Sequence, residues 1–122
     1  MKSHEDLIVY QKSLDFVVSI YKIANTFPKN EIFGLASQIT RAAVSIPSNI
    51  SEGAGSQTKK EFLQFLYIAQ GSANEVDTQL EIALRLRYIE NKQDIYQELI
   101  SIKRMLANLI KSCKVQNVTS DK

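Results

Sequence analysis

The sequence contains few of the residues that interrupt helices or carry metal and redox chemistry. Its 122 residues include two prolines, four glycines, one cysteine, one histidine and no tryptophan. A single cysteine, Cys113, excludes an internal disulfide and fits a reducing compartment. The one histidine, His4, cannot supply the pair of Glu-x-x-His motifs that a di-metal helix bundle requires. We therefore expect no metal, no cofactor and no enzymatic activity.

A strong charge imbalance and long apolar runs are also missing. Fifteen basic and 13 acidic residues leave a net charge of +2, which does not by itself indicate a nucleic-acid partner. No segment reaches the roughly 20 apolar residues of a membrane span, and no apolar run with a cleavage site follows the polar residues 1–6. We expect a cytoplasmic protein with no membrane partner. At 44% hydrophobic residues, the chain suits a single domain, 1–122, around one core.

Helical periodicity dominates the apolar pattern, and no alternating strand pattern runs across the chain. The predicted helices span about 7–26, 31–54, 58–88 and 91–114, followed by a frayed polar tail at 115–122. Phe27 before Pro28 stops the first helix, and Thr58 with Glu61 forms a capping box that opens the third. The short loops predict an all-α, antiparallel up-down-up-down four-helix bundle.

Particular residues shape the predicted helices. In the first helix we expect one apolar stripe to face the core: Leu7, Tyr10, Leu14, Val17, Tyr21 and Ala24. Pro47 costs the second helix ~3 kcal/mol, and we expect a kink rather than a break because the apolar stripe keeps its phase on both sides. Gly53 and Gly55 are expected to end that helix with positive φ. Small residues around Gly71 predict a close approach of a neighbouring backbone to the third helix.

The second helix also has a polar face. Four polar residues fall within a sector of about 100°, apart from the apolar stripe: Arg41, Ser45, Asn49 and Glu52. Arg41 and Glu52 lie about 16 Å apart along the axis, so they cannot pair within one helix. We expect these residues to form a hydrogen-bonded layer between helices or subunits. Arg41 would then pair with Glu75, with Asp77 or with a carboxylate of a neighbouring subunit; alternatively, its side chain reaches water.

The start of the third helix is apolar around almost its whole circumference. The residues concerned are Phe62, Leu63, Phe65, Leu66 and Tyr67. A bundle helix buries one stripe, so a helix that is apolar all round needs cover on a second side. Because exposed apolar patches of this size mark interfaces, we expect the protein to associate with copies of itself through these residues. The number of copies does not follow from this argument.

Basic residues gather in the fourth helix and at the start of the third: Lys59, Lys60, Lys103, Arg104, Lys111 and Lys114. The segment 99–114 contains no acid, and an up-down bundle places 59–60 and 111–114 at one end. A symmetric oligomer would repeat this charge, which makes RNA or DNA a candidate partner. The alternative is that the cations complement a helix dipole, because several acids lie near the same end: Glu5, Asp6, Glu52 and Glu61.

Two weaker motifs favour structural interpretations. Cys113 and His4 fall at one end of the predicted bundle, but a core cysteine and a solvated histidine are favoured over a nucleophilic pair. The run Gly53-Ala54-Gly55 before Lys59 is similar to a phosphate-binding loop. No strand precedes it and the Walker spacing is missing, so a helix C-cap turn is favoured.

Several motifs together resemble one known family. They are Val9-Tyr10-Gln11-Lys12, Phe27-Pro28 with Glu31, Gln38-Ile39, Arg41-Ala42-Ala43, Ser45-Ile46-Pro47-Ser48-Asn49-Ile50, Glu52-Gly53, Glu61-Phe62, Phe65-Leu66, Ile68-Ala69 and Gly71-Ser72. The chain resembles the 23S rRNA intervening-sequence protein family over about residues 7–110. That resemblance implies an antiparallel four-helix bundle that assembles as a ring-like homopentamer. Members are often encoded inside intervening sequences of the large ribosomal RNA gene.

The resemblance also bears on function. A related branch, the accessory variability determinant proteins of diversity-generating retroelements, binds nucleic acid and a reverse transcriptase. This chain has Ser56-Gln57 where many members carry two arginines, and Thr40 where many carry a second basic residue. Both differences remove positive charge from a region that a nucleic acid would contact.

These observations predict a non-enzymatic, self-assembling bundle that acts as a scaffold or a nucleic-acid-associated accessory protein. Its expected partners are copies of itself and RNA or DNA, with an unidentified protein as a further candidate. The first alternative is a protein-interaction scaffold that does not bind nucleic acid. The second is a small enzyme, for which the sequence offers no catalytic constellation.

Overall fold

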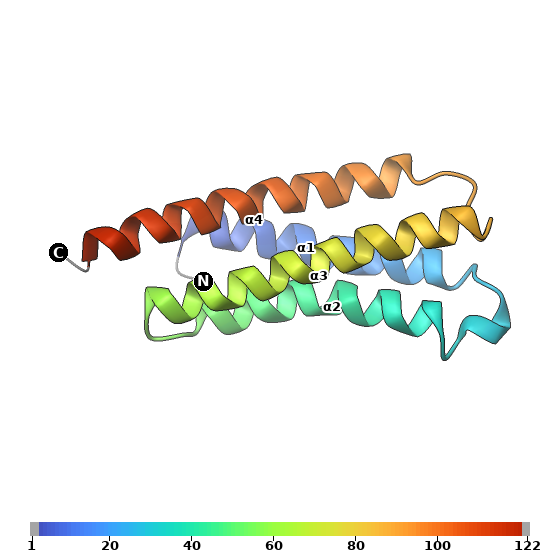
Figure 1. The fold of residues 1–122 in the computed structure, drawn as a ribbon, viewed down its shortest axis with the longest axis horizontal. Helices are drawn as coiled ribbons and strands as arrows, with labels where there is room; N and C mark the ends of the chain where they lie inside the picture. The colour runs from blue at the N-terminus through green and yellow to red at the C-terminus, as the bar shows by residue number, and fades with distance from the viewer. Residues whose placement is uncertain (1–2, 121–122) are drawn as a thin grey trace.

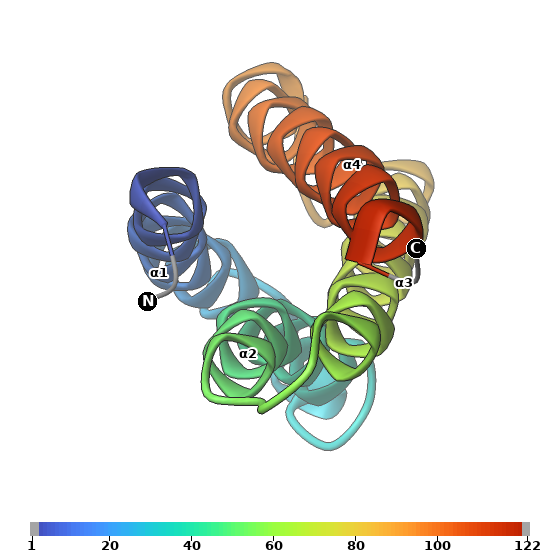
Figure 2. The same ribbon diagram turned by 90° about the vertical axis from the view of Figure 1, so that its left-hand side faces the viewer.

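A computed structural model of the chain describes the backbone of residues 3–120 and the side chains of residues 3–115. Over those residues it contains four α-helices and a short 3₁₀ helix, with no strand. The α-helices are α1 (His4–Ala24), α2 (Leu35–Ala54), α3 (Lys59–Arg85) and α4 (Gln93–Ser120), and the 3₁₀ helix η1 spans Lys29–Glu31. In Figure 1 the chain runs rightward along α1 and α3 and leftward along α2 and α4. Figure 2 shows the four helices following one another around the bundle.

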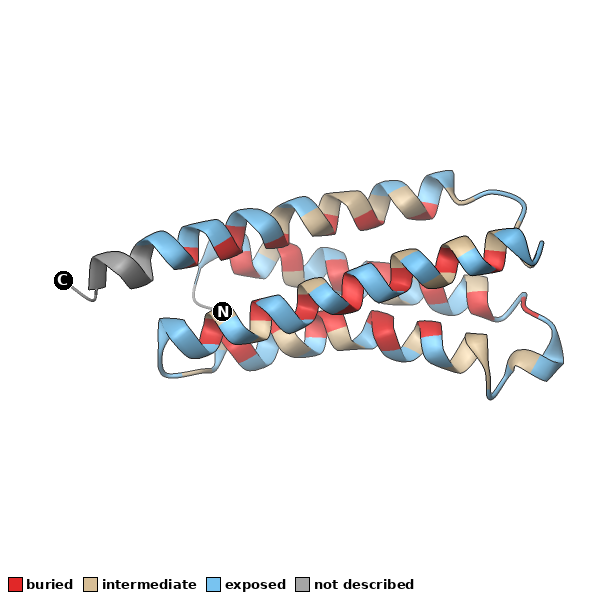
Figure 3. Ribbon diagram, in the orientation of Figure 1, coloured by how far each residue is buried: buried red, intermediate tan, exposed pale blue. Residues whose placement is uncertain are grey.

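The core lies between the inner faces of the four helices. α2 packs against α1 and α3, and α4 packs against α3 and α1. The large, fully buried side chains come from every helix: Val9, Phe16, Ile20, Ile39, Ile46, Ile50, Leu66, Val76, Leu80, Leu99, Ile102 and Leu106. They recur at intervals of three, four, seven or ten residues, which places them on one stripe of each helix. Figure 3 shows buried positions along each of the four helices.

The expected inward stripe of α1 is confirmed at Ala24, and Tyr10 and Val17 pack against the core while half-buried, but it is wrong at Leu7, Leu14 and Tyr21. The buried residues of α1 are Asp6, Val9, Ser13, Phe16, Ile20 and Ala24. Leu7, Leu14 and Tyr21 are instead 36–48% exposed, and Tyr10 and Val17 are half-buried. Helix α1 therefore carries two neighbouring apolar stripes, one facing the core and one facing outward. Spacing alone cannot decide which of two such stripes enters a core.

The helix boundaries follow from local capping. Ser3 Oγ accepts a hydrogen bond from Asp6 N at 3.1 Å, and Thr58 Oγ1 accepts one from Glu61 N at 3.1 Å, so the sequence correctly marks the start of α3. Helix α3 ends at Arg85, three residues before the expected end, because Arg87 has φ 62 and turns the chain. Helix α4 continues to Ser120, well beyond its expected end near residue 114.

Helix α2 begins later than expected and continues through Pro47. The segment before Leu35 forms η1 and a turn, and Glu31 Oε1 caps α2 by accepting the Leu35 N–H at 3.1 Å. The expectation that Gly53 and Gly55 have positive φ is wrong, since no glycine among the described residues does. Gly53 lies inside α2 for a packing reason: an added β-carbon would be 2.7 Å from Phe62 Cδ1 and 2.9 Å from Phe65 Cβ.

The loops at the end of the bundle opposite the N-terminus are tied together. The Tyr88 hydroxyl donates a hydrogen bond to Glu31 Oε2 at 2.8 Å, and the Tyr88 ring lies 5.4 Å from the Phe27 ring. The hydrogen bond to Glu31 raises the pKa of Tyr88 above its usual value of 10.0, because ionisation would place a second negative charge beside the carboxylate. The Glu31 carboxylate thus joins the α1–α2 loop to the α3–α4 loop.

Candidate interaction surfaces

A polar layer lies between α2 and α3. Ser72 Oγ donates to Ser45 Oγ at 2.8 Å, and Asn49 Nδ2 donates to Ser45 Oγ at 3.0 Å and to the Ser45 carbonyl at 2.8 Å. Ser45 and Asn49 therefore take part in the expected hydrogen-bonded layer, and Ser72 is their partner on the neighbouring helix. Ser72 is buried, so satisfying its hydroxyl removes the penalty of an unpaired polar group in the core.

The two charged members of the predicted stripe lie outside this layer. Arg41 and Glu52 are both exposed, and among residues 3–115 neither makes an ion pair within 4.0 Å. Arg41 borders a pocket of about 350 Å³ together with Glu75 and Gln79, whose Oε1 is buried without a donor among the described residues. The expectation that Arg41 pairs with Asp77 is wrong, because the Asp77 carboxylate is bound by two lysines instead.

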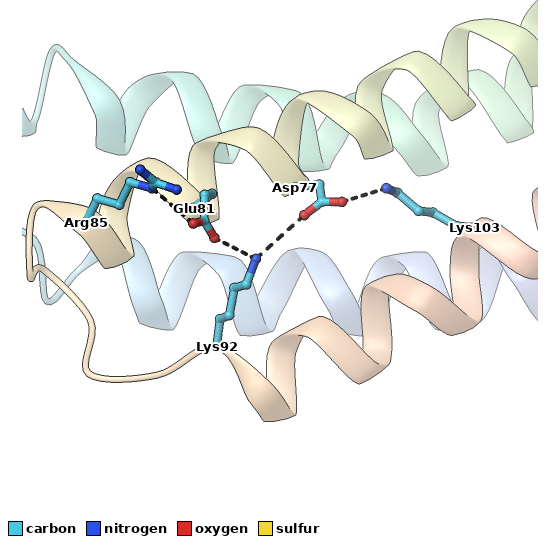
Figure 4. A network of polar contacts seen from close by, with 5 residues as sticks. All are labelled: Asp77, Glu81, Arg85, Lys92 and Lys103. Carbon is cyan, nitrogen blue, oxygen red and sulfur yellow. Dashed lines mark hydrogen bonds and ion pairs between the residues drawn. The ribbon is translucent and has the colours of Figure 1, made fainter.

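Asp77 belongs to an ion-pair network that links α3 to the start and middle of α4 (Figure 4). Lys92 Nζ lies 2.9 Å from Glu81 Oε2 and 4.0 Å from Asp77 Oδ1. Lys103 Nζ lies 2.8 Å from Asp77 Oδ2, and Arg85 Nε lies 3.1 Å from Glu81 Oε1. Only the Glu81–Arg85 pair could be predicted from the sequence, because its two residues lie four apart on one helix. The others depend on how α3 and α4 pack.

The ion pairs of this network shift the pKa values of Glu81 and Lys92 in opposite directions. Hydrogen bonds from Lys92 and then Arg85 lower the pKa of Glu81 below its ordinary value of 4.5. The hydrogen bond to Glu81 raises the pKa of Lys92 above 10.5, against the opposing effect of burial. Both shifts keep the pair charged at neutral pH, as mutual attraction requires.

Of the six predicted basic residues, one forms an ion pair within the subunit and five are exposed. Lys103 is half-buried and held by Asp77, so it is not available to a phosphate. The other five are exposed: Lys59, Lys60, Arg104, Lys111 and Lys114. Lys114 Nζ lies 5.5 Å from the centre of the exposed Tyr67 ring, within the range of a cation–π contact. The start of α3 and the C-terminal part of α4 lie at the same end of the bundle, as Figure 1 shows.

The apolar residues at the start of α3 lie mostly inside the subunit. Phe62 and Leu66 are buried in its core, and Leu63 and Phe65 are half-buried. Only Tyr67 of the predicted interface is exposed. Phe62 and Leu66 are therefore unavailable to a second copy. Helix α3 packs against both α2 and α4, which covers Phe62, Leu63, Phe65 and Leu66 wholly or in part. The exposed side chains of Tyr67 and Ile68 leave part of its circumference uncovered.

A different surface carries apolar side chains that are exposed or half-buried. A groove of about 360 Å³, which we call the α1–α2 groove, is lined by the exposed Leu14 and Val44, the half-buried Tyr10 and Val17 and the buried Pro47. A second depression of about 420 Å³, between the end of α1 and the start of α2, is bordered by Tyr21, Ile32 and Ala36. Together the two depressions follow the outward stripe of α1. The residues of this stripe were in the sequence pattern, but we had expected them in the core.

The described residues offer few side chains suited to catalysis or to metal binding. No group of three His, Cys, Asp or Glu side chains there could hold a metal ion. Cys113 is buried with Sγ donating to the Lys59 carbonyl at 3.3 Å, which agrees with the core interpretation.

Gly71 has no neighbouring atom within 4 Å of an added β-carbon, so the expected close backbone approach at this glycine is absent from the subunit. None of the helices, over the described residues, is long and apolar enough for a membrane crossing.

Comparison with known proteins agrees with this fold. A sequence profile of the 23S rRNA-intervening sequence protein family matches residues 5–108. The crystal structure of a protein of unknown function from the S23 ribosomal protein family of Bacteroides thetaiotaomicron is similar, with a TM-score of 0.81 and 33% sequence identity. The similarity covers 88% of this chain and 98% of that one. No curated protein matches the chain in sequence. From the profile match and the shared helical fold, the chain belongs to the 23S rRNA-intervening sequence protein family.

Proposed function

We propose that this protein is a non-enzymatic, cytoplasmic accessory protein that assembles into a ring of antiparallel four-helix bundles and binds nucleic acid through its basic surface. One observation carries the proposal: the outward apolar stripe of α1 and the α1–α2 groove beside it are only partly covered by the subunit's own helices, with Leu14 and Val44 exposed. Apolar side chains arranged in this way along a whole helix are stabilised when a partner removes them from water.

The occupant of the α1–α2 groove is a second copy of the chain. The outward stripe recurs at residues 7, 10, 14, 17 and 21, alternating steps of three and four as in the seams where helices pack side by side. The resemblance to the intervening-sequence family implies a homopentamer, which is the number of copies that we propose. A closed ring requires that one surface of each subunit meets a different surface of the next.

Arg41 and Glu52 suit a contact between subunits. Both are exposed and neither is paired within the described part of the subunit, whereas Ser45 and Asn49 on the same face are satisfied internally. An arginine and a carboxylate from adjacent copies could pair where one ring subunit meets the next. A double-mutant cycle with Arg41→Ala and Glu52→Ala tests this pairing. If the two substitutions have additive effects on the melting temperature and leave the assembly unchanged, the proposed pairing is wrong.

The nucleic-acid surface that we propose is the outer face of α4 and the start of α3. Arg104, Lys111 and Lys114 are exposed, and no acid occurs between residues 99 and 114. Around a ring, these side chains would form a repeated array of cations that phosphate groups could neutralise. Because no base-reading motif is present, binding would depend on charge and shape.

Binding of fluorescently labelled RNA and DNA at two salt concentrations tests this proposal. For wild type, affinity should fall steeply with salt, with a slope of about −0.9 for each duplex phosphate neutralised. Arg104→Gln with Lys111→Gln should weaken binding and flatten that slope. Lys22→Gln, which removes an exposed cation from α1, is the matched control and should leave both unchanged.

A protein-interaction scaffold remains the alternative function. It is favoured by the balance of charge near the basic end, where the exposed Glu5, Glu52 and Glu61 accompany the lysines. If wild type binds neither RNA nor DNA, or binds with an affinity that salt does not change, the nucleic-acid role is wrong and the scaffold is supported.

A further inference from the structure

A cavity of about 270 Å³ lies where α1 and α3 begin and α4 approaches its end. It is bordered by Ser3, Glu5, Asp6, Lys59, Phe62, Leu109, Ser112 and Cys113. Its volume suits a small molecule rather than a segment of a macromolecule, because ligand pockets for drug-sized molecules start at about 300 Å³. The cavity is separate from the α1–α2 groove and shares only Lys59, at the start of α3, with the proposed nucleic-acid surface.

Asp6 gives this cavity its chemical character. Its side chain is almost completely buried, with 1% exposure, and faces inward from the first turn of α1. The backbone N–H of Asp6 is bound by Ser3 Oγ, but carboxylate oxygen Oδ2 is buried and accepts no hydrogen bond from the residues that the structure describes. A buried carboxylate without a donor is destabilising, so this oxygen favours any ligand that brings an N–H group.

The charge around the cavity selects the sign of the ligand. The only buried charged side chain that borders it is Asp6, whereas the other two, Glu5 and Lys59, are exposed, of opposite sign and can extend into solvent. A cation is therefore favoured over an anion, even though the N-termini of α1 and α3 lie nearby. Phe62 and Leu109 add an apolar wall that could cover a short hydrocarbon chain.

We propose that this cavity binds a small primary alkylammonium ion, with Asp6 as the anchoring acceptor. The ammonium group donates to Asp6 Oδ2, and hydroxyls such as that of Ser112 accept its remaining N–H groups. The alkyl chain lies against Phe62 and Leu109. A free alkylamine and a lysine side chain of another protein share this chemistry, and the limited volume favours the free amine. The proposal does not depend on ring assembly or on nucleic-acid binding.

Calorimetric titration of the full-length protein with n-butylammonium chloride, at constant ionic strength, tests the proposal. Wild type should bind one ion per subunit, and its melting temperature should rise with ligand concentration. Asp6→Asn should weaken binding at least tenfold. Glu61→Gln makes the same carboxylate-to-amide change on the first turn of α3, outside the cavity lining, and should bind as wild type does. Nα-acetyl-lysine amide should bind more weakly than butylammonium; tighter binding of the lysine derivative would overturn the choice of a free amine.

A second variant and a second readout keep the test decisive. Ser112 lies at the exposed side of the lining, and Ser112→Leu narrows the cavity while retaining Asp6, so it should weaken binding even if Asp6→Asn does not fold. Because Cys113 borders the cavity and is the only cysteine, bound butylammonium should also slow its modification by a thiol reagent. The proposal is overturned if wild type shows no saturable binding, or if Asp6→Asn and Ser112→Leu bind as tightly as wild type.

Discussion

Arg87 ends α3 in a backbone conformation that an L-residue adopts at a cost. Its φ is 62, and the hydrogen bonds from Tyr88 N to the Ala83 carbonyl and from Arg87 N to the Leu84 carbonyl form a Schellman motif. Glycine is the usual residue at this position because it lacks the β-carbon that crowds the left-handed region. The turn between α3 and α4 is therefore fixed by the backbone pattern rather than by a favourable residue.

We predict that Arg87→Gly stabilises the fold by about 1 kcal/mol. The free energy of unfolding, measured by urea denaturation at fixed protein concentration, should increase. Arg104→Gly is the matched control: Arg104 is exposed inside α4, where the same change should destabilise by about 1 kcal/mol. Equal effects of the two substitutions would contradict the assignment of Arg87 to a left-handed cap.

The Glu81–Lys92 pair predicts how stability depends on pH. Glu81 has a lowered pKa in the folded protein, so its contribution is present above the ordinary value of 4.5 and is lost as pH falls through the folded value. Without Lys92 that shift is smaller. Between about pH 5 and about pH 3, the melting temperature of Lys92→Met should therefore fall less steeply than that of wild type. Lys22→Met, an exposed lysine of α1, should keep the wild-type slope.

Sequence reasoning at the residue scale succeeds where the signal is local. The cap at Thr58 and the hydrogen bond from Asn49 to Ser45 depend on spacing within one helix, and both are present in the structure. Arg41 and Glu52, the charged members of the predicted layer, lie outside it. The burial of Asp6 and the contact of Lys92 with Glu81 depend on which helices meet, so no local pattern indicated them. Only the Ser3-x-x-Asp6 spacing of a helix start could have drawn attention to Asp6.

At the scale of the helix, two glycines have opposite roles. Gly53 lets the end of α2 approach the start of α3, because any β-carbon there would collide with Phe62 and with the β-carbon of Phe65. Gly71, in the middle of α3, is exposed and has nothing within 4 Å of an added β-carbon. The sequence identified a glycine-dependent contact between helices but placed it at Gly71.

We predict opposite effects of alanine at these two positions. Gly71→Ala should stabilise α3 by about 1 kcal/mol through helix propensity. Gly53→Ala should destabilise by about 1–3 kcal/mol because the added methyl group overpacks the α2–α3 contact. Urea denaturation with circular dichroism measures both. A destabilised Gly71→Ala protein that also dissociates would instead place Gly71 in a contact between subunits.

The two apolar stripes of α1 explain why the helix orientation was harder to predict than the helix itself. Val9, Phe16 and Ile20 satisfy helical periodicity as well as Leu7, Leu14 and Tyr21 do. The inner stripe even contains Asp6 and Ser13, which hydropathy alone would place outside. The choice is made by how well each stripe packs against α2 and α4. That information lies in the whole bundle and not in the helix.

At the scale of the molecule, the α1–α2 groove and the acid-free basic segment 99–114 lie on different helices. The apolar surface follows α1 and α2, whereas the acid-free basic surface follows α4. A ring held together through the first could leave the second open to solvent on every subunit. Assembly and nucleic-acid binding are therefore separable, and variants of the α1–α2 groove should test the first without removing a single cation.

The molar mass in solution, measured by light scattering after size-exclusion chromatography, tests the assembly most directly. For the 13.8 kDa chain, we predict a wild-type mass of about 69 kDa, as a homopentamer requires. Leu14→Lys and Val44→Lys, on the two sides of the α1–α2 groove, should each reduce the mass towards that of one subunit. Gln97→Lys adds the same charge at an exposed polar position of α4 and should retain the wild-type mass. A monodisperse wild-type species of 13.8 kDa at micromolar concentration would contradict the account.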